Sequence, residues 1–256
     1  MSQQPRRPLP AGPQTGTSAG PEHRRHTSGW PAEADRFDNR STAGRALGAV
    51  LADQIDPGRQ RPLVLAVPRG GVVVAGEIAA AIDADLDVMV AIPIGLPWRP
   101  GVTVGAVAGS DTAVLDHDAL AVAGSTPADT TPIVQRCRAG LRARQDRYRG
   151  DRPPAPVAGR TVVVIDDGLS PGIVTRAVVR AVRAADPARL VYGAPVCAAE
   201  SADLLHADAD AVVHLHSPRV FPALGLWYRD MTPVTDHDVT TLLAQIWGAP
   251  TTTTVG

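Results

Sequence analysis

Residues 161–172 constrain the fold of this chain more than any other feature. They read Thr-Val-Val-Val-Ile-Asp-Asp-Gly-Leu-Ser-Pro-Gly. The apolar run predicts a buried parallel strand, because parallel strands covered on both faces are apolar throughout. The strand ends in Asp166 and Asp167, and a glycine-containing turn and a helix follow. Because open α/β sheets bind phosphorylated ligands at the carboxyl ends of their strands, we expect a ligand site here.

The remaining sequence alternates strand-like and helix-like segments. This alternation predicts an α/β fold with a central, mostly parallel sheet and helices on both faces. Further strands are expected at residues 63–67, 86–92, 190–196 and 211–215. Helices are expected from a cap at Ser41, after the turn at 68–71 through Ile82, over 132–149, after the acidic motif through Ala184, over 200–207 and from about Asp236. Residues 93–101 contain proline and glycine and predict a long loop, whereas residues 102–108 and 112–115 predict a hairpin.

The two ends of the chain differ in composition from its middle. Residues 1–34 are rich in Pro, Gly, Ser and Gln, which predicts a disordered tail, and residues 249–256 predict a second, loose tail. Residues 35–248 are long enough to bury one core, so one domain is expected between the tails.

Charge and residue usage exclude several classes of function. The net charge of −1 gives no field that favours nucleic acid, and all 25 basic residues are arginine. Without lysine, Schiff-base chemistry and a Walker-type lysine are excluded. Cys137 and Cys197 have no partners at metal-ligand spacing, which fits a reducing cytosol. No apolar run reaches bilayer length and no secretory signal is evident, so a cytoplasmic protein without membrane contact is expected.

The acidic strand end allows three interpretations from its residues alone. In the first, the carboxylates bind sugar hydroxyls directly or through Mg²⁺, and the backbone after them binds a phosphate. In the second, the acids are ordinary turn formers, with Ser170 as a helix cap. In the third, Gly168 to Gly172 form the nucleophile elbow of an α/β-hydrolase with Ser170 as nucleophile. Pro171 weakens this third interpretation, because it has no N–H for an oxyanion hole.

Five segments in this order resemble one known family. They read Phe-Asp-Asn-Arg-Ser-Thr-Ala-Gly at 37–44, Leu-Ala-Val-Pro-Arg-Gly-Gly at 65–71, Val-Gly-Ala-Val at 104–107, Val-Ile-Asp-Asp-Gly at 164–168 and Gly-Leu-Trp-Tyr-Arg-Asp at 225–230. Together they resemble the type I phosphoribosyltransferases, and in particular a bacterial subgroup of unassigned substrate. The resemblance covers nearly the whole expected domain.

The resemblance implies a role for each motif. Asp166 and Asp167 would hold the ribose of phosphoribosyl pyrophosphate, with Mg²⁺ bound directly or through water. The 5′-phosphate would lie on the loop formed by Gly168, Leu169, Ser170, Gly172, Ile173, Val174 and Thr175. Arg69, Gly70 and Gly71 would hold the pyrophosphate, because an arginine chelates phosphate and glycine lets the backbone approach. Trp227 and Tyr228 would stack on the base, or alternatively close the end of the core.

The sequence departs from the family pattern at three places. Pro171 and Val174 stand where the phosphate loop usually has threonines. Ala91-Ile92 replaces a common Arg-Lys pair, and a glycine, Gly101 or Gly109, stands where the flexible hairpin often has Glu. Losing these donors predicts a degenerate phosphate loop and weaker phosphate binding, since charge-assisted hydrogen bonds contribute roughly 1.5–3 kcal/mol each.

The expected function is therefore that of a glycosyltransferase of nucleotide metabolism that moves a 5-phosphoribosyl group from phosphoribosyl pyrophosphate, with Mg²⁺, to a nitrogenous acceptor. The alternative is a non-catalytic regulatory protein of the same fold that binds a nucleotide or phosphosugar. A Ser170 hydrolase is the third possibility. The partner would be a small phosphosugar or nucleotide and not nucleic acid, and the oligomeric state, including a homo-oligomer, stays open.

Overall fold

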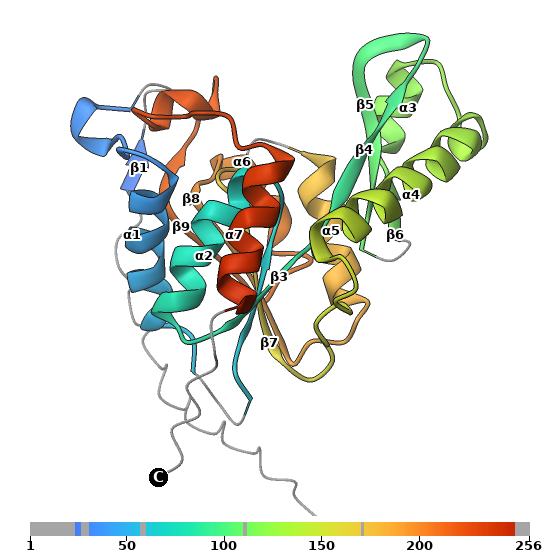
Figure 1. Ribbon diagram of the computed structural model, residues 1–256. Helices are drawn as coiled ribbons and strands as arrows, with labels where there is room; N and C mark the ends of the chain where they lie inside the picture. Colours follow the sequence, from blue (N-terminus) through green and yellow to red (C-terminus); the bar gives the residue numbers. More distant parts are fainter. Residues whose placement is uncertain (1–23, 27–30, 57–59, 110–111, 170–171, 249–256) are drawn as a thin grey trace, which may run out of the picture.

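The computed structural model describes residues 24–26, 31–56, 60–109, 112–169 and 172–248. It confirms the predicted α/β fold: a parallel sheet with helices on both faces (Figure 1). Within these ranges no helix is both long and apolar enough to cross a bilayer.

The main sheet has six strands, and each neighbouring pair is parallel. Their order is β1-β9-β8-β7-β2-β3. The strands are β1 (Arg24–His26), β2 (Leu63–Ala66), β3 (Asp85–Val88), β7 (Thr161–Ile165), β8 (Arg189–Val196) and β9 (Ala211–Pro218). The acidic motif follows β7, which lies in the interior of the sheet between β2 and β8. Because β2 and β7 are adjacent and parallel, the loops after them leave the sheet on the same side, at the carboxyl ends of the strands.

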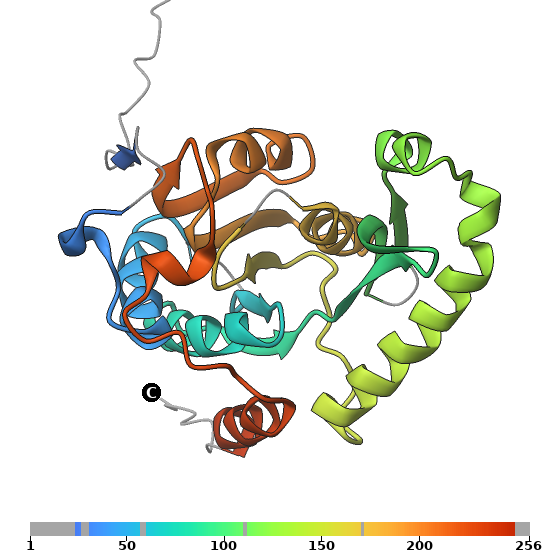
Figure 2. The ribbon, with the colours of Figure 1, turned by 90° about the horizontal axis from the view of Figure 1, so that it is seen from above.

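Successive side chains of β7 point to opposite faces of the sheet, as the strand period of two requires. Val163 and Ile165 join the core under α1 (Arg40–Ala52), α2 (Gly70–Ala81) and α7 (Asp236–Gly248). Val162 and Val164 join the core under α5 (Ile173–Arg183) and α6 (Ala199–Leu205). Figure 2 shows these two helical layers on either side of the sheet. The helices therefore explain why the strand is apolar throughout.

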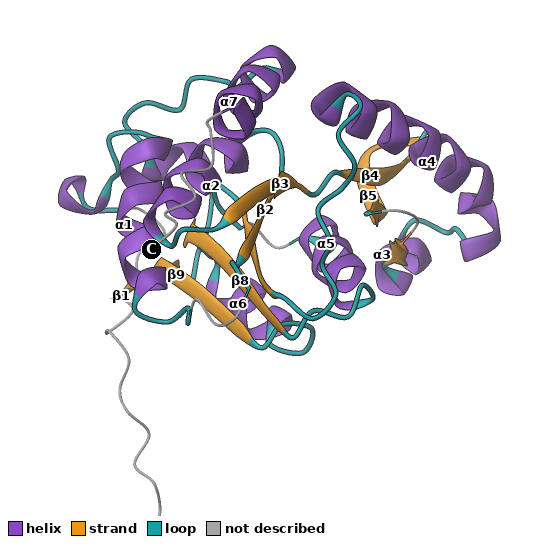
Figure 3. Ribbon diagram, turned by 60° about the horizontal axis from the view of Figure 1, so that its bottom comes forward, coloured by secondary structure: helices purple, strands orange, loops and turns teal. Residues whose placement is uncertain are grey.

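A second, antiparallel sheet extends from the main one (Figure 3). It contains β4 (Ala91–Leu96), β5 (Arg99–Ala108) and β6 (Thr112–Leu115), and α3 (His117–Val122) and α4 (Pro127–Arg149) pack against it. The predicted β5–β6 hairpin is confirmed, but the loop predicted at 93–101 is wrong. Ile94 and Leu96 are buried between exposed residues, so the segment has strand periodicity. Its proline is tolerated because β4 is an edge strand.

Several element boundaries differ from the predictions. The cap of α1 is Asn39, which forms a capping box with Thr42, rather than Ser41. The helix therefore begins at Arg40, which lies in its first turn. Helix α4 begins at Pro127 after the cap Thr126, and Pro132 lies inside it. Within the predicted N-terminal tail, residues 1–34, the described residues form β1 and the start of a short 3₁₀ helix at Glu33–Asp35. Residues 1–23, 27–30 and 249–256 lie outside the described part.

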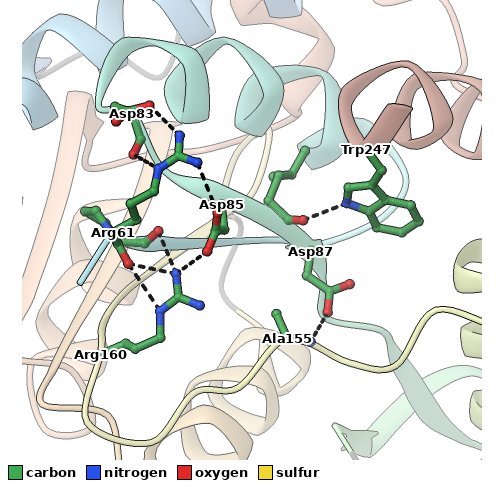
Figure 4. Close-up of polar contacts among 9 residues, drawn as sticks. Arg61, Asp83, Asp85, Asp87, Ala155, Arg160 and Trp247 are labelled. Atoms are coloured by element: carbon green, nitrogen blue, oxygen red, sulfur yellow. Dashed lines mark hydrogen bonds and ion pairs between the residues drawn. The ribbon is translucent and has the colours of Figure 1, made fainter. Parts of the chain in front are cut away.

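A polar cluster fixes the amino ends of β2, β3 and β7 relative to one another (Figure 4). The Arg160 guanidinium donates to the carbonyl oxygens of Arg61, at 2.7 Å, and Pro62, at 3.2 Å. It also donates to the Asp85 carboxylate at 2.6 Å, while Arg61 pairs with Asp83. The buried Arg160 thus connects three strands at their amino ends, whereas the acidic motif lies at the carboxyl ends.

Candidate functional site

The loops after β2 and β7 meet at one edge of the sheet. Ala66 is opposite Ile165 in the register, so Gly70 and Gly71 at the start of α2 come against the acidic motif. A Cβ on Gly70 would lie 1.9 Å from Asp167 Oδ2, and a Cβ on Gly71 would lie 2.9 Å from the Ile165 carbonyl oxygen. Only glycine permits this approach. The peptide bond between Pro68 and Arg69 is cis.

The two acids have different surroundings. Asp167 Oδ2 accepts a hydrogen bond from Arg40 Nε at 2.7 Å, and these side chains are 13% and 12% exposed. Asp166 Oδ1 accepts the backbone N–H of Asp167 at 2.8 Å. Burial, together with the neighbouring Asp167 charge, raises the pKa of Asp166 well above its usual value, and Arg40 partly opposes this. The pair therefore combines one ion-paired carboxylate with one carboxyl group that resists ionisation.

Arg40 was not singled out from the sequence, although it lies in a motif that carries the family resemblance. Besides Asp167, it binds the carbonyl oxygen of Thr232 through Nη1 at 2.9 Å. The first turn of α1 and the segment after Trp227 thus meet at the acidic strand end. The sequence signal for Arg40 was its place in residues 37–44, and that segment gave no indication of its partner Asp167, 127 positions away.

The predicted aromatic pair is buried. Trp227, in a 3₁₀ helix at Leu224–Trp227, is 0% exposed and packs against His216 with ring centroids 5.2 Å apart. Tyr228 is 1% exposed, and its hydroxyl donates to the Asp167 carbonyl oxygen at 2.6 Å. Both rings are enclosed, which favours the second of the two predicted roles, that these aromatics close the core. Tyr228 in addition supports the backbone of the acidic motif.

Leu224 is a further residue that the sequence did not reveal. Its side chain lies against Gly168, where a Cβ would come within 2.2 Å of Leu224 Cδ1. Leu224 and Leu226 are partly buried, unlike the enclosed Trp227 beside them.

The predicted phosphate loop leads into the amino end of α5. Leu169 is buried and its N–H donates to the Val196 carbonyl oxygen at 2.8 Å, while Gly172 occupies the cap position without a side-chain cap. Ile173, Val174 and the buried Thr175 form the first turn. Ser170 and Pro171 lie outside the described residues, so the structure does not test the hydrolase interpretation or the missing threonine at 171.

A cavity of about 430 Å³ lies at this end of α5. Most of its wall is aliphatic, and Val174 is part of it, where the family usually has a hydroxyl. The lining residues are Thr103, Asp116, Leu169, Gly172, Ile173, Val174, Thr175, Arg176, Ser201, Leu204 and Leu205. The main chain of α5 can therefore offer N–H groups to an anion here, and Arg176 is the one cationic side chain among the described residues that line the cavity.

Arg69 is 54% exposed and lies beside the amino end of α7. Its Nη1 is 3.8 Å from Asp236 Oδ1. Asp236 also accepts from the Tyr148 hydroxyl and from Arg147, both at 2.7 Å, and these contacts lower the pKa of Asp236. The exposed guanidinium at a long ion-pair distance remains available to a phosphate. Asp236 thus connects the start of α2 to the end of α4.

The other departures from the family pattern lie in the second sheet. Ala91 and Ile92 begin β4, and Ile92 Cδ1 packs towards α4, 3.3 Å from where a Cβ on Gly140 would lie. Gly101 and Gly109 have positive φ values of 85° and 65°. Residues at these places contribute packing and turns, and none supplies a charge to the site.

The acid pair cannot by itself enclose a magnesium ion, so Mg²⁺ bound here would take its other oxygen ligands from water and substrate phosphate, as is usual for this ion. Among the described residues no group of three His, Cys, Asp or Glu side chains could hold a metal ion. The nearest positive charge to Asp167 is the Arg40 guanidinium, which already binds Oδ2. The same carboxyl groups do fit sugar hydroxyls, which are hydrogen-bond donors.

A family profile and a curated relative identify one family, and a solved structure is similar to the chain over most of its length. The profile described as the phosphoribosyl transferase domain matches residues 35–216. "Putative phosphoribosyl transferase Rv0571c" of Mycobacterium tuberculosis is 32% identical over 207 residues, which cover 81% of this chain and 46% of the relative. The chain thus spans about half the length of that relative. The crystal structure of TT1426 from Thermus thermophilus is 38% identical, with a TM-score of 0.69 over 82% of this chain and 98% of that one.

Proposed function

The chain belongs to the phosphoribosyl transferase domain family, and from that premise we propose that it transfers a 5-phosphoribosyl group from phosphoribosyl pyrophosphate to a nitrogenous acceptor. One observation carries the proposal: the glycine turn after β2 lies directly against the acids after β7, at 1.9 Å from a Cβ on Gly70 to Asp167 Oδ2. These two motifs are almost 100 positions apart in the sequence, and each is predicted to hold one part of the same co-substrate. They lie together at the carboxyl ends of β2 and β7.

In this proposal each part of the edge holds one part of the co-substrate. Asp166 and Asp167 accept hydrogen bonds from the ribose hydroxyls. The N–H groups at the start of α5 hold the 5′-phosphate, helped by the positive end of the helix. The start of α2 and Arg69 hold the diphosphate, for which Arg69 exchanges its long contact with Asp236 for phosphate oxygens.

The reaction breaks the bond between C1′ and the diphosphate oxygen and forms a bond from C1′ to the acceptor nitrogen. The bonding electrons leave with the diphosphate, and the nitrogen loses its proton to solvent or to the leaving group. Magnesium would enter as part of the co-substrate and neutralise diphosphate charge. The residues of the chain contribute positioning and leaving-group stabilisation rather than covalent chemistry.

A second candidate function, a regulatory protein that binds a nucleotide or phosphosugar without turnover, is favoured by the composition of the α5 cavity. Val174 lines it in place of a hydroxyl, and Ile92 packs in the core where the family often has a cation. Such a site would retain a sugar phosphate with less transition-state stabilisation, because fewer charged donors face the diphosphate.

Calorimetric titration of phosphoribosyl pyrophosphate with Mg²⁺ tests both candidates. We expect micromolar binding by the wild type and none by Asp166→Asn/Asp167→Asn, with Glu77→Gln on α2 as a matched acid-to-amide control. Pyrophosphate release with a panel of purine, pyrimidine and amine acceptors then separates a transferase from a regulator. Equal binding by the wild type and the double variant would refute the proposed site.

A further inference from the structure

We propose that Arg40 is the resident cation of the acidic strand end, holding Asp167 for a sugar-phosphate ligand at the position where a divalent ion would otherwise bind the protein. This inference rests on the proposed function for the identity of the ligand. It assigns a positioning role to a residue outside the family's phosphate, pyrophosphate and ribose motifs.

The first support is geometric. Arg40 Nε lies 2.7 Å from Asp167 Oδ2, and both side chains are nearly buried. Arg40 Nη1 is fixed by the Thr232 carbonyl oxygen, and the Asp167 carbonyl oxygen is fixed by Tyr228. Both partners of the ion pair are thus anchored at a second point, which keeps the guanidinium on the carboxylate.

The second support is the enclosure of the pair by the glycine turn. The position of a Cβ on Gly70 lies 2.7 Å from Arg40 Nε as well as 1.9 Å from Asp167 Oδ2. The absent side chain of Gly70 therefore leaves room for the ion pair itself. The proposed diphosphate loop therefore packs directly on the guanidinium. An ion pair exposed to solvent would not need a glycine beside it.

The third support concerns access and charge. Arg40 also lines a cavity of about 350 Å³ together with Asn39, Asp230 and Thr232. A shortened side chain at position 40 would open Asp167 to solvent from that cavity. Mg²⁺ binds oxygen ligands at about 2.0–2.1 Å and guanidinium and metal ion compete for the same negative charge, so removing Arg40 should create metal affinity.

Manganese, a paramagnetic probe for magnesium sites, tests this on the full-length chain without any other ligand. We would follow the free Mn²⁺ signal by electron paramagnetic resonance during titration. For Arg40→Gln we expect one equivalent bound at least about tenfold more tightly than by the wild type, because an uncompensated carboxylate gains the cation. The gain should disappear in Arg40→Gln/Asp167→Asn.

Two variants control for charge and helix position. Arg40→Lys keeps the positive charge and should bind Mn²⁺ as weakly as the wild type. Arg45→Gln removes an exposed arginine from the same helix, paired with Glu77 at 3.5 Å, and should also leave Mn²⁺ binding unchanged. A purely structural ion pair would predict altered thermal stability in Arg40→Gln with no new metal affinity.

Unchanged Mn²⁺ affinity in a folded Arg40→Gln protein would overturn the inference. If that variant does not fold, the comparison of wild type with Asp167→Asn decides: equal Mn²⁺ binding supports it, and a metal site lost with the carboxylate refutes it. A parallel phosphoribosyl pyrophosphate titration separates the two proposals. If phosphoribosyl pyrophosphate does not bind but Arg40→Gln binds Mn²⁺ more tightly, only the proposed function is refuted. If phosphoribosyl pyrophosphate binds but Arg40→Gln gains no Mn²⁺ affinity, only the role of Arg40 is refuted.

Discussion

Two arginine–aspartate clusters lie at opposite ends of the same parallel strands. At the amino ends, Arg160 divides its donors among two carbonyl oxygens and Asp85 (Figure 4). At the carboxyl ends, Arg40 directs Nε to Asp167 beside a second acid and two glycines. The first cluster uses a charge to satisfy backbone groups. The second concentrates charged side chains beside two glycines that leave room for them. Similar ion pairs thus align strands at one end of the sheet and, in our proposal, hold a ligand site at the other.

The largest expected effect is on the amino-end cluster. Arg160→Ala should lower the free energy of unfolding by about 3–4 kcal/mol, because it removes charged donors from two carbonyl oxygens at the start of β2 and from the Asp85 carboxylate on β3. Urea denaturation measures this loss. Mn²⁺ affinity should stay at the wild-type level, since the Asp85 side chain is 44% exposed and keeps its ion pair with Arg61. If Arg160→Ala bound Mn²⁺ more tightly than the wild type, Arg160 would keep a metal ion from its carboxylate as Arg40 is proposed to do, and the two clusters would not differ in this respect.

A control for this experiment lies in the same figure. Arg61→Ala removes the exposed contacts to Asp83 and Asp85 but leaves the Arg61 carbonyl oxygen bound to Arg160. The expected loss is under about 1 kcal/mol, as for other solvent-exposed ion pairs.

The next effect tests the carboxyl end. Gly70→Ala places a methyl group 1.9 Å from Asp167 Oδ2 and should cost about 2–3 kcal/mol of stability through overpacking. It should also abolish phosphosugar binding, because Arg40 and Asp167 must separate. Calorimetry and urea denaturation measure the two effects. Gly95→Ala, whose Cβ would meet nothing closer than 3.7 Å, is the matched control and should change neither.

In both clusters, what could be predicted from the sequence differs from residue to residue. The acids after β7 and the glycines after β2 were predictable because each set adjoins a strand with a local apolar signal. Arg40 was not, since it reaches Asp167 across 127 positions and its own helix pattern gives no such contact. Arg160 was also missed, because its main partners are carbonyl oxygens, and every residue has one.

Other differences came from local signals that conflicted with tertiary packing. Proline and glycine in residues 93–101 predicted a loop, but the pairing of β4 with β5 buried Ile94 and Leu96 instead. Trp227 was a reasonable ligand contact as an aromatic in a loop-like segment. Its burial beside His216 depends on the fold of β9, which the local sequence does not encode.

A smaller effect should follow from restoring a donor next to the carboxyl-end cluster. Val174→Thr should tighten phosphosugar binding about fivefold, which corresponds to about 1 kcal/mol for one added hydrogen bond. Pro171→Thr/Val174→Thr should tighten it further. Val122→Thr, on an exposed site of α3, controls for the substitution itself. Calorimetric affinities that stay unchanged in both threonine variants would show that this loop does not bind the phosphate.

The smallest effect concerns Asp236, which joins α2, α4 and α7. Its contacts with Tyr148 and Arg147 lower its pKa, so they stabilise the folded state above the ordinary value for aspartate, near 3.9, and less as the pH falls below it. Asp236→Asn should cost about 0.5–1 kcal/mol at pH 7, because Arg147 is largely exposed. The difference from wild type in thermal or urea unfolding should shrink as the pH falls below the ordinary value for aspartate and through the lowered pKa of Asp236. A difference that grows on acidification would contradict the assignment.

The wide sequence separation of the carboxyl-end contacts has a consequence for how the protein is made. Asp167 follows Arg40 by 127 positions, and Tyr228 follows Asp167 by 61. At ordinary translation rates the first interval alone takes on the order of ten seconds, during which Arg40 and the glycine turn have left the ribosome without their counter-charge. A fragment that stops before Tyr228 carries Arg40, Asp166 and Asp167 without the hydroxyl that anchors the acidic loop.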